Sequence, residues 1–333
     1  MRRAPAFWQR DGLLPRLLSP VGALVGGVTA LRLRREGWYC PIPVICVGNA
    51  TVGGAGKTTV ALDLARRLAA QGWAVHVLLR GYGRSSRGLR WVEPGDPVQE
   101  AGDEALLHAA VAPTWTCADR RLGAQAAVAA CAEVLLLDDG LQNPGVQKNL
   151  SLLVIDGATG FGNGRVLPAG PLREPVAAAA ARCQAAVLIG PDATNALARL
   201  PPSLPVLRAR LEPSPEAAAL AGRRVVGFAG IALPDKFFAT LEGIGAEIVG
   251  RRPFPDHHAY TEAELNHLLN ETERLNALPV TTAKDMVRLP RHVQERVEVL
   301  RVELLWEDTS QPQQLLGETL GRRGGGAAVS RSI

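Results

Sequence analysis

One stretch of the chain decides its fold: Val44-Ile45-Cys46-Val47-Gly48-Asn49-Ala50-Thr51-Val52-Gly53-Gly54-Ala55-Gly56-Lys57-Thr58-Thr59. The apolar run at its start predicts a buried strand, and the glycine-rich segment after it predicts a loop. Residues 60–68 then place apolar side chains three and four apart, which indicates a helix that ends near Gly72. Strand, glycine-rich loop and helix follow one another in the order of a P-loop. We therefore expect residues 51–58 to bind the phosphates of a nucleotide.

The loop contains the residue types that this chemistry requires. Glycines allow backbone N–H groups to turn toward phosphate oxygens, and the helix amino terminus adds a positive dipole end. Lys57 would place its ammonium between the β- and γ-phosphates, and the hydroxyl of Thr58 would ligate Mg²⁺. Thr51 stands where the pattern has its first glycine, so the loop entry must accommodate a β-branched residue. The competing interpretation is a glycine-rich turn that only connects a strand to a helix.

A second motif follows the apolar run at residues 134–137, which ends in Asp138, Asp139 and Gly140. A strand that ends in acids downstream of a P-loop is typical of a Walker B motif, which directs a carboxylate toward Mg²⁺. A surface turn could hold the same three residues. Because side chains alternate along a strand, the two aspartates should point in opposite directions and should not share one role. The pattern does not decide which of them contacts the metal.

The rest of the chain predicts an α/β fold with a doubly wound, mostly parallel sheet, as in P-loop NTPases. Proline becomes frequent around residues 201–215, and a second apolar series begins at Val225, so a boundary is expected near residue 222. The predicted organisation is a membrane-associating helical segment (1–36), a P-loop domain (37–222), a smaller C-terminal α/β domain (223–321) and a flexible tail (322–333). The further predicted strands are residues 74–79, 134–137, 152–155, 186–189 and 225–228.

The amino-terminal segment is apolar and flanked by arginines. Ser19 and Pro20 resemble an N-cap and a first helical position, so a helix is expected from Pro20 toward Arg35. A signal peptide does not fit, because Leu31-Arg32-Leu33-Arg34-Arg35 is not a small-residue cleavage site. A buried core helix, a helix in the membrane interface and a membrane span remain, although prolines, glycines and Arg16 make the span marginal. The interfacial helix is favoured.

Composition and charge argue against a disordered chain and give no reason to expect a nucleic-acid-binding or disulfide-stabilised protein. The chain has 333 residues, 47% hydrophobic and 21% charged, which is ordinary for a globular protein. The net charge of +5 is modest; it does not imply nucleic acid, and it fits anionic lipid or a phosphorylated substrate. Nothing in the sequence requires a protein partner. The five cysteines include no Cys-x-x-Cys pair, so we expect neither a disulfide framework nor a zinc site, and a reducing compartment.

Together these motifs resemble the tetraacyldisaccharide 4′-kinase family, the lipid A 4′-kinases of Gram-negative bacteria. The resemblance runs from the amino-terminal helix to about Asp285, and a hydroxylated residue such as Thr51 is usual at the loop entry of this family. Besides the P-loop, the motifs that carry it are Arg80-Gly81-Tyr82-Gly83-Arg84, Gly102-Asp103-Glu104, Asp138-Asp139-Gly140-Leu141-Gln142, Leu167-Pro168-Ala169-Gly170-Pro171-Leu172-Arg173-Glu174, Phe228-Ala229-Gly230-Ile231, Phe254-Pro255-Asp256-His257-His258-Ala259-Tyr260 and Thr281-Thr282-Ala283-Lys284-Asp285.

The resemblance implies that ATP and Mg²⁺ are used to phosphorylate the 4′-hydroxyl of a tetraacyldisaccharide 1-phosphate, which forms lipid IVA at the cytoplasmic face of the inner membrane. It also implies a nucleotide cleft between two domains and an amino-terminal helix that dips into the membrane. Lys57 keeps its phosphate role, Asp103 matches the family's base, and the histidine that orients this base aligns with His257 rather than His258. The residues implied to hold substrate phosphate or to order the site are Arg120, Arg121, Arg173 and Glu174.

Two other functions are compatible with a P-loop. A membrane-recruited GTPase would recognise guanine through Asn-Lys-x-Asp, a string that does not occur; Ala283-Lys284-Asp285 is no substitute. An ATP-dependent synthetase of a soluble metabolite would need neither detergent nor a bilayer for its acceptor. The choice of donor nucleotide and of acceptor separates these possibilities.

Overall fold

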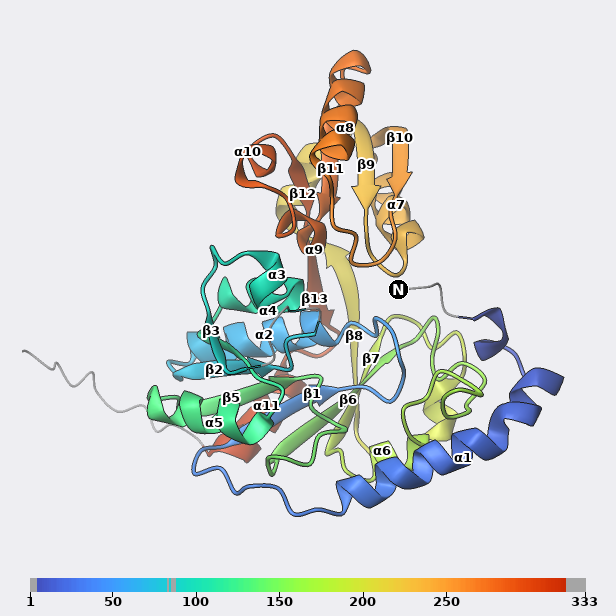
Figure 1. The fold of residues 1–333 in the computed structure, drawn as a ribbon, viewed down its shortest axis with the longest axis vertical. Helices are drawn as coiled ribbons and strands as arrows, with labels where there is room; N and C mark the ends of the chain where they lie inside the picture. Colours follow the sequence, from blue (N-terminus) through green and yellow to red (C-terminus); the bar gives the residue numbers. More distant parts are fainter. Residues whose placement is uncertain (1–4, 83, 85–87, 322–333) are drawn as a thin grey trace, which may run out of the picture.

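The computed structural model describes residues 5–82, 84 and 88–321. This part of the chain forms two bodies, a larger one around a nine-stranded sheet and a smaller one around a four-stranded sheet (Figure 1). The predicted tail, residues 322–333, and Gly83 of the Arg80–Arg84 motif lie outside the described residues. The α/β class predicted from the sequence is confirmed.

The larger sheet contains β1 (Val44–Gly48), β2 (Val75–Leu79), β3 (Arg90–Val92), β4 (Thr114–Thr116), β5 (Val134–Asp138), β6 (Leu150–Asp156), β7 (Ala185–Ile189), β8 (Val206–Pro213) and β13 (Val302–Trp306). Their order is β13-β8-β7-β6-β1-β5-β2-β4-β3. Neighbours from β8 to β4 pair in parallel, and β13 and β3 are antiparallel edge strands. Every residue of β1, β5 and β6 is buried, as continuous apolar runs predict for parallel strands with both faces covered.

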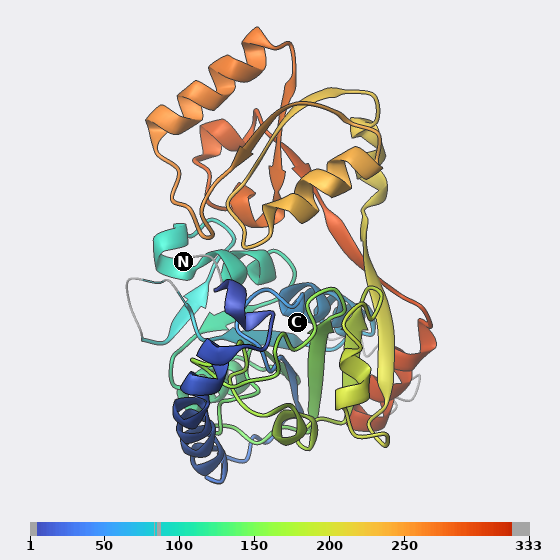
Figure 2. The same ribbon diagram turned by 90° about the vertical axis from the view of Figure 1, so that its right-hand side faces the viewer.

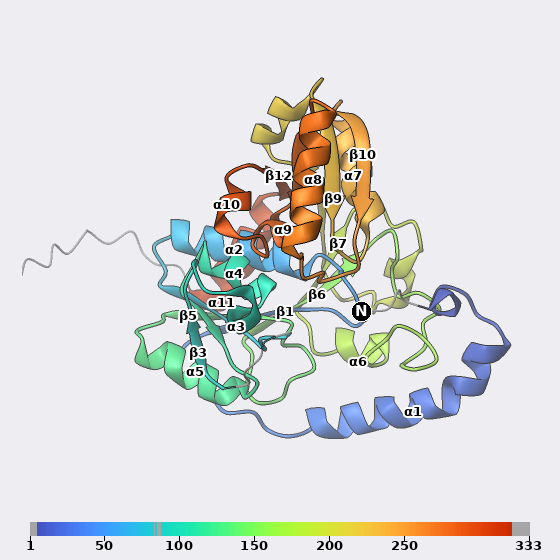
Figure 3. The ribbon, with the colours of Figure 1, turned by 45° about the horizontal axis from the view of Figure 1, so that its top comes forward.

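Helices cover both faces of the larger sheet. Those on one face are α2 (Lys57–Ala70), α3 (Val98–Ala101), α4 (Asp103–Ala109) and α11 (Ser310–Leu320). Those on the other face are α5 (Arg120–Ala129), α6 (Val176–Ala180) and the 3₁₀ turn η2 (Ala196–Arg199). Figures 1 and 3 show α2 and α5 on opposite sides of the sheet. The fold is therefore doubly wound, and the carboxyl end of β1 opens toward the smaller body.

The smaller body contains β9 (Arg224–Ala229), β10 (Glu247–Pro253), β11 (Leu278–Thr282) and β12 (Glu298–Leu300), in the order β10-β9-β11-β12 and all parallel. Helix α7 (Pro234–Gly243) packs on one face and α8 (Glu262–Arg274) on the other. The remaining short elements are η3 (Pro215–Leu220), α9 (Ala283–Met286) and α10 (Arg291–Gln294). The loops at the carboxyl ends of β9 and β11 face the larger body.

Strands β8 and β13 pair along the side that connects the two bodies (Figure 2). After the smaller body is complete, the chain returns through β13 and α11 to the larger one, although residues 302–320 were expected in the C-terminal domain. The reason is packing: Trp306 and Leu316 are buried in the core beneath α2, and Trp306 Nε1 donates a hydrogen bond of 2.8 Å to Asp63. The last strand and helix therefore belong to the nine-stranded sheet.

Helix α1 (Leu13–Leu33) follows the 3₁₀ turn η1 (Ala6–Trp8) and lies along the outside of the larger body (Figure 1). The predicted start at Pro20 is wrong: the helix begins at Leu13 and continues through Pro20. Contacts on both sides of the proline hold it to the larger body, since Arg165 donates to the hydroxyl of Ser19 and Gly22 packs on Val166. Gly22 allows close contact, since a Cβ there would lie 2.7 Å from the carbonyl oxygen of Val166.

The opposite side of α1 is an exposed apolar stripe, in which Leu17 and Leu24 are 75% and 70% exposed. The stripe consists of Leu13, Leu14, Leu17, Val21, Leu24, Val25, Val28 and Leu31. By length and composition, α1 could cross a membrane, and only 17% of its most apolar window is buried. A buried core helix is thereby excluded.

Candidate active site

The P-loop connects β1 to α2 and is fixed at both ends. Gly56 has a φ of 82°, and a Cβ at this position would lie 2.5 Å from Cδ1 of Ile189, so only glycine fits. At the entry, the N–H of Val52 donates to the carbonyl of Pro171 at 2.8 Å, and Thr51 forms an antiparallel β-bridge with Leu172. An extended, paired position suits a β-branched residue, which explains why threonine replaces the expected glycine.

The two acids that follow the apolar run of β5 have different partners, as expected, although Asp139 lies just beyond the strand in a left-handed conformation and not within its alternation. Asp138 is buried, and its Oδ2 accepts a hydrogen bond of 3.0 Å from Nε2 of His108. Asp139 has a φ of 56°, and its Oδ1 lies 2.7 Å from Nη1 of Arg173 and 3.9 Å from Nζ of Lys57. Asp139 therefore faces the P-loop, whereas Asp138 contacts α4.

The donor set at this end of the sheet fits Mg²⁺. Oδ1 of Asp138 is buried and has no hydrogen-bond partner among the described residues. Burial raises the pKa of Asp138, but the hydrogen bond from His108 and the charges of Lys57 and Lys284 outweigh this effect and hold the pKa below its usual range. An ionised carboxylate with a free oxygen, close enough to the P-loop to be affected by the charge of Lys57, is a site that a cation would satisfy.

Arg120 and Arg121 occupy different environments at the start of α5. Arg120 is buried, and its guanidinium donates to the carbonyls of Cys117 and Asp138 at 3.3 and 3.4 Å. Burial lowers the pKa of Arg120 to about 10, while the charges of Asp139 and Asp138 oppose this shift. The side chain of Arg121 is exposed. Arg120 thus orders the end of β5, and Arg121 is accessible from solvent.

Arg173 and Glu174 join a network with Gln142. The side-chain amide of Gln142 donates to the carbonyl of Asn49 at 2.8 Å and to Glu174 at 2.9 Å, and its oxygen accepts from Arg173 at 3.2 Å. Glu174 is buried, and both of its oxygens accept from Arg182 at 2.7 Å. This network ties the Walker B motif to the entry of the P-loop.

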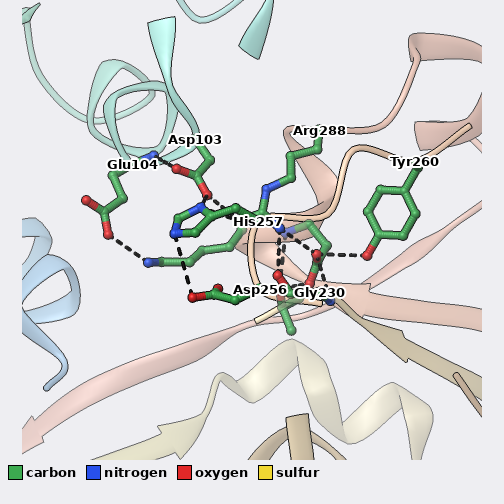
Figure 4. Close-up of polar contacts among 10 residues, drawn as sticks. Asp103, Glu104, Gly230, Asp256, His257, Tyr260 and Arg288 are labelled. Carbon is green, nitrogen blue, oxygen red and sulfur yellow. Dashed lines mark hydrogen bonds and ion pairs between the residues drawn. The ribbon is translucent and has the colours of Figure 1, made fainter. Parts of the chain in front are cut away.

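A second set of charged groups forms where the two bodies meet (Figure 4). Asp103 lies at the start of α4 in the larger body, and its Oδ2 accepts a hydrogen bond of 2.9 Å from Nδ1 of His257 in the smaller body. His257 has a φ of 59°, and its N–H donates to the carbonyl of Gly230. The preference for His257 over His258 agrees with this geometry, because His258 instead contacts Glu264 at 3.1 Å.

The electrostatics of Asp103 and His257 favour an ion pair. The hydrogen bond from His257 to Asp103 raises the pKa of the imidazole, while burial opposes this shift. Burial also raises the pKa of Asp103, but the hydrogen bond from His257 and the charge of Arg288 outweigh it, so this pKa lies well below its usual value. The lowered pKa of Asp103 keeps its carboxylate ionised, and the raised pKa of His257 favours the imidazolium beside it.

Lys284 connects the P-loop end of the larger sheet with the Asp103–His257 pair. Its Nζ lies 2.8 Å from Oε1 of Glu104, next to Asp103. Burial lowers the pKa of Lys284, but the charges of Glu104, Asp103 and Asp138 raise it above its ordinary value. Asp103 and Asp138 thus act on the same ammonium, so the P-loop end of the sheet and the Asp103–His257 pair form one electrostatic site.

The model of the family described as tetraacyldisaccharide-1-P 4′-kinase matches residues 14–320. The chain belongs to this family. A protein named tetraacyldisaccharide 4′-kinase from Gluconacetobacter diazotrophicus is 54% identical over 316 residues, which cover 94% of this chain and 97% of that protein. Another of that name, from Rhodospirillum centenum, is 52% identical over 328 residues, with 96% and 97% covered.

A solved structure shows the same arrangement of elements. It is a crystal structure of LpxK from Aquifex aeolicus in complex with ATP, 27% identical to this chain, with a TM-score of 0.76 over 92% of this chain and 100% of that one. The chain is therefore a kinase that uses ATP with Mg²⁺, and the GTPase and synthetase interpretations are not favoured.

Two residues of the kinase's site escaped the sequence analysis. Arg288 is 4% exposed and contacts Asp103, and His108 is fully buried against Asp138. Arg288 is one of many arginines, and a lone histidine on a short helix is more often a core residue than a functional one, so neither carried a signal. The spacing of Arg288 three residues after Asp285, a pair at 2.9 Å, was the only hint.

Proposed function

We propose that this kinase transfers the γ-phosphate of ATP to the 4′-hydroxyl of the tetraacyldisaccharide 1-phosphate lipid, forming lipid IVA. The observation that supports it most is the convergence of a P-loop with a carboxylate–imidazole pair, through the shared environment of Lys284. A P-loop accounts for the donor, and a carboxylate steadied by an imidazole accounts for a hydroxyl acceptor. Membership in the family supports a lipid-linked sugar as that acceptor.

On the donor side, the loop of residues 51–58 holds the phosphates of ATP with the backbone N–H groups beyond Val52, because the N–H of Val52 itself is bonded to the carbonyl of Pro171. The ammonium of Lys57, 11% exposed and close to Asp139, neutralises charge between the β- and γ-phosphates. The hydroxyl of Thr58 and a carboxylate oxygen of Asp138 or Asp139 would hold Mg²⁺, and the buried free oxygen of Asp138 favours Asp138. When bound, the metal spreads the charge of the phosphate oxygens. Positioning and charge neutralisation supply most of the rate enhancement.

On the acceptor side, Asp103 orients the 4′-hydroxyl and takes its proton. The oxygen of the sugar forms a bond to the γ-phosphorus while the bond to the β–γ bridging oxygen breaks, and ADP leaves with that electron pair. His257, held protonated beside Asp103, keeps the carboxylate in place. Arg173, through Asp139, and Glu174, through Gln142, order the donor side. Arg120 fixes the end of β5, and the exposed Arg121 is available to a lipid phosphate.

The kinase works at the cytoplasmic face of the inner membrane, where residues 1–36 bring the site to its substrate. The apolar stripe of α1 faces away from the larger body, and Arg32, Arg34 and Arg35 follow it in the chain. Such a helix can lie among lipid headgroups with its apolar side in the acyl chains. In this division, residues 37–213 with β13 and α11 form the P-loop body. The segment from η3 to β12 forms the second domain, because Ala217 and Leu220 of η3 are buried in its core.

The reaction is tested by incubating the full chain with γ-labelled ATP, Mg²⁺ and the disaccharide 1-phosphate lipid in mixed micelles. Label should enter the 4′ position of the lipid, and GTP should be a poor donor. Label in a water-soluble acceptor, or equal use of GTP, would refute the proposal.

The membrane association is tested by replacing Leu17 and Leu24 with glutamine, because these side chains contact solvent and not the protein core. The double variant should leave vesicles of inner-membrane lipid in a flotation assay while its ATP affinity stays the same. The matched control replaces Leu89 and Leu122 with glutamine, because these two leucines are also exposed but lie outside α1. Unchanged flotation of the α1 variant would assign the anchoring to another surface.

A further inference from the structure

The carboxylate of Asp103 has three hydrogen bonds, distributed unevenly over its two oxygens. Oδ1 accepts the backbone N–H of Glu104 at 2.9 Å. Oδ2 accepts two donors, Nδ1 of His257 at 2.9 Å and Nη2 of Arg288. A carboxylate offers about four lone-pair sites, two on each oxygen. With the described residues in place, the remaining site is on Oδ1.

Arg288 has little conformational freedom. Its Nη1 donates to the carbonyl of Gly230 at 2.8 Å and to Oδ1 of Asp285 at 2.9 Å. Asp285 is fully buried and is itself fixed by the N–H of Gly230 and by the hydroxyls of Tyr260 and Thr282. The smaller body therefore holds the guanidinium rigidly in the position where it meets Asp103 of the larger body (Figure 4).

The charges around Asp103 come from both bodies. The titratable groups that face it or its partners are Tyr82, Glu104, Asp256, His257, Lys284, Asp285 and Arg288. Burial raises the pKa of Asp103, and the hydrogen bond of His257 together with the charge of Arg288 reverses this effect. Without Arg288, two buried carboxylates, Asp103 and Asp285, would lose the cation that they share.

We propose that Arg288 is a positioning residue for phosphoryl transfer, which fills Oδ2 of Asp103 together with His257 and so presents Oδ1 to the sugar hydroxyl. The inference rests on the proposed role of Asp103 as the base. The proton of the 4′-hydroxyl then passes to Oδ1, while Oδ2 keeps its two donors. Arg288 contacts neither reactant; it acts through the orientation and the ionisation of Asp103.

The experiment compares Arg288→Gln and Arg288→Lys of the full chain in the micellar assay, with the pH profile of kcat as the main readout. Arg288→Gln should lower kcat roughly 10- to 100-fold. The KM for ATP should stay within about 3-fold, because the P-loop is untouched. The acidic limb of the profile should move to higher pH, since Asp103 loses a stabilising cation.

Arg288→Lys tests whether a conservative replacement restores function, and Arg296→Gln is the control. Arg288→Lys should return the acidic limb toward its original position but not restore kcat, because an ammonium cannot bond Asp103, Asp285 and Gly230 in one plane. Arg296→Gln removes an exposed arginine of the same body, paired with Glu273, and should leave both readouts unchanged. Melting temperatures show whether each variant folds.

The outcomes separate this inference from the proposed function. If Asp103→Asn keeps full activity, the proposed base is wrong. If Asp103→Asn is inactive while Arg288→Gln keeps its acidic limb in place, only the role of Arg288 is wrong. If Arg288→Gln is too unstable to assay, Arg288→Lys provides the test. A kcat of Arg288→Lys equal to that of the wild type would overturn the inference. In the Asp103→Asn background, Arg288→Gln should cost less than about 2-fold, and a full multiplicative loss would contradict the proposal.

Discussion

The phosphate loop and the Asp103 cluster are built in opposite ways. The loop consists of consecutive residues between a buried strand and a helix of one body. The cluster joins Asp103 to His257, 154 residues away in the chain, and to Arg288, 185 residues away. The loop therefore depends on local backbone geometry, whereas the cluster depends on how two bodies meet.

This difference predicts how each site responds to change. A loop clamped by β1, α2 and the Thr51–Leu172 bridge keeps its shape as long as the larger body is folded. The cluster requires in addition that the smaller body stays docked, which depends on ion pairs and on Val287, packed against the core of the larger body. Substitutions at the loop should therefore act on chemistry alone, and those at the interface on chemistry and docking together.

The largest effect is expected from Lys57→Ala in the loop. It should lower kcat by about 10³-fold, because it removes the point charge on the transferred phosphate. The melting temperature should hardly change, since the fold of the loop does not depend on this side chain. Arg66→Ala, an exposed arginine of the same helix, is the control. Near-normal turnover of folded Lys57→Ala would remove the phosphate role.

The next largest effect concerns the pair of Asp103 and His257. Asp103→Ala should lower kcat by about 10²-fold, the lower end of the usual contribution of a general base. If the two residues act as one unit, Asp103→Ala/His257→Ala should be less than about 2-fold worse than Asp103→Ala alone. Steady-state kinetics of the two single variants and the double variant complete the cycle, and losses that multiply would show independent roles.

A smaller effect is expected from docking alone. Lys236 of α7 lies 2.7 Å from Asp156 at the end of β6, and Lys236 is 56% exposed. Solvent screens Lys236, although Asp156 is only 10% exposed, so the pair contributes about 1 kcal/mol. Lys236→Gln should therefore lower kcat by less than about 5-fold and leave ATP affinity unchanged. Arg251→Gln, which breaks the pair with Glu242 inside the smaller body, should have no effect on kcat. An equal loss of kcat in Lys236→Gln and Arg251→Gln would mean that docking of the smaller body does not control the activity of the Asp103 cluster.

The smallest effect is a pH dependence of stability. Because the pKa of His257 is raised in the folded chain, its stabilising contribution is complete below about pH 6.5 and is lost as the pH rises through the folded pKa. His257 is 34% exposed, so solvent screening keeps this contribution below about 1 kcal/mol. Urea midpoints of the wild type and His257→Gln should differ more at pH 6 than at pH 9. An equal difference at both values would argue against a protonated imidazole.

The sequence predicted much of the larger body. The strands at residues 44–47, 74–79 and 134–137 occur as β1, β2 and β5, because a continuous apolar run between turns has few alternatives to a buried parallel strand. The start of α1 and the place of residues 302–320 could not be predicted. The start of α1 depends on the contact of Gly22 with Val166. The place of residues 302–320 depends on the burial of Trp306 in a core that exists only once the nine-stranded sheet has formed.

The sequence by itself determined the donor half of the chemistry, which is the phosphate-binding loop. The roles of its glycine, lysine and threonine depend only on the backbone conformation of a few adjacent residues. The acceptor half was implied only by the resemblance to a family, and the tertiary structure decided its contacts. It brought His257 rather than its neighbour to Asp103, turned Asp138 and Asp139 to different partners, and placed a buried arginine on the carboxylate. The physical reason is that local backbone preferences act between neighbours in the chain, whereas contacts across 154 or 185 residues depend on the packing of two separately cored bodies.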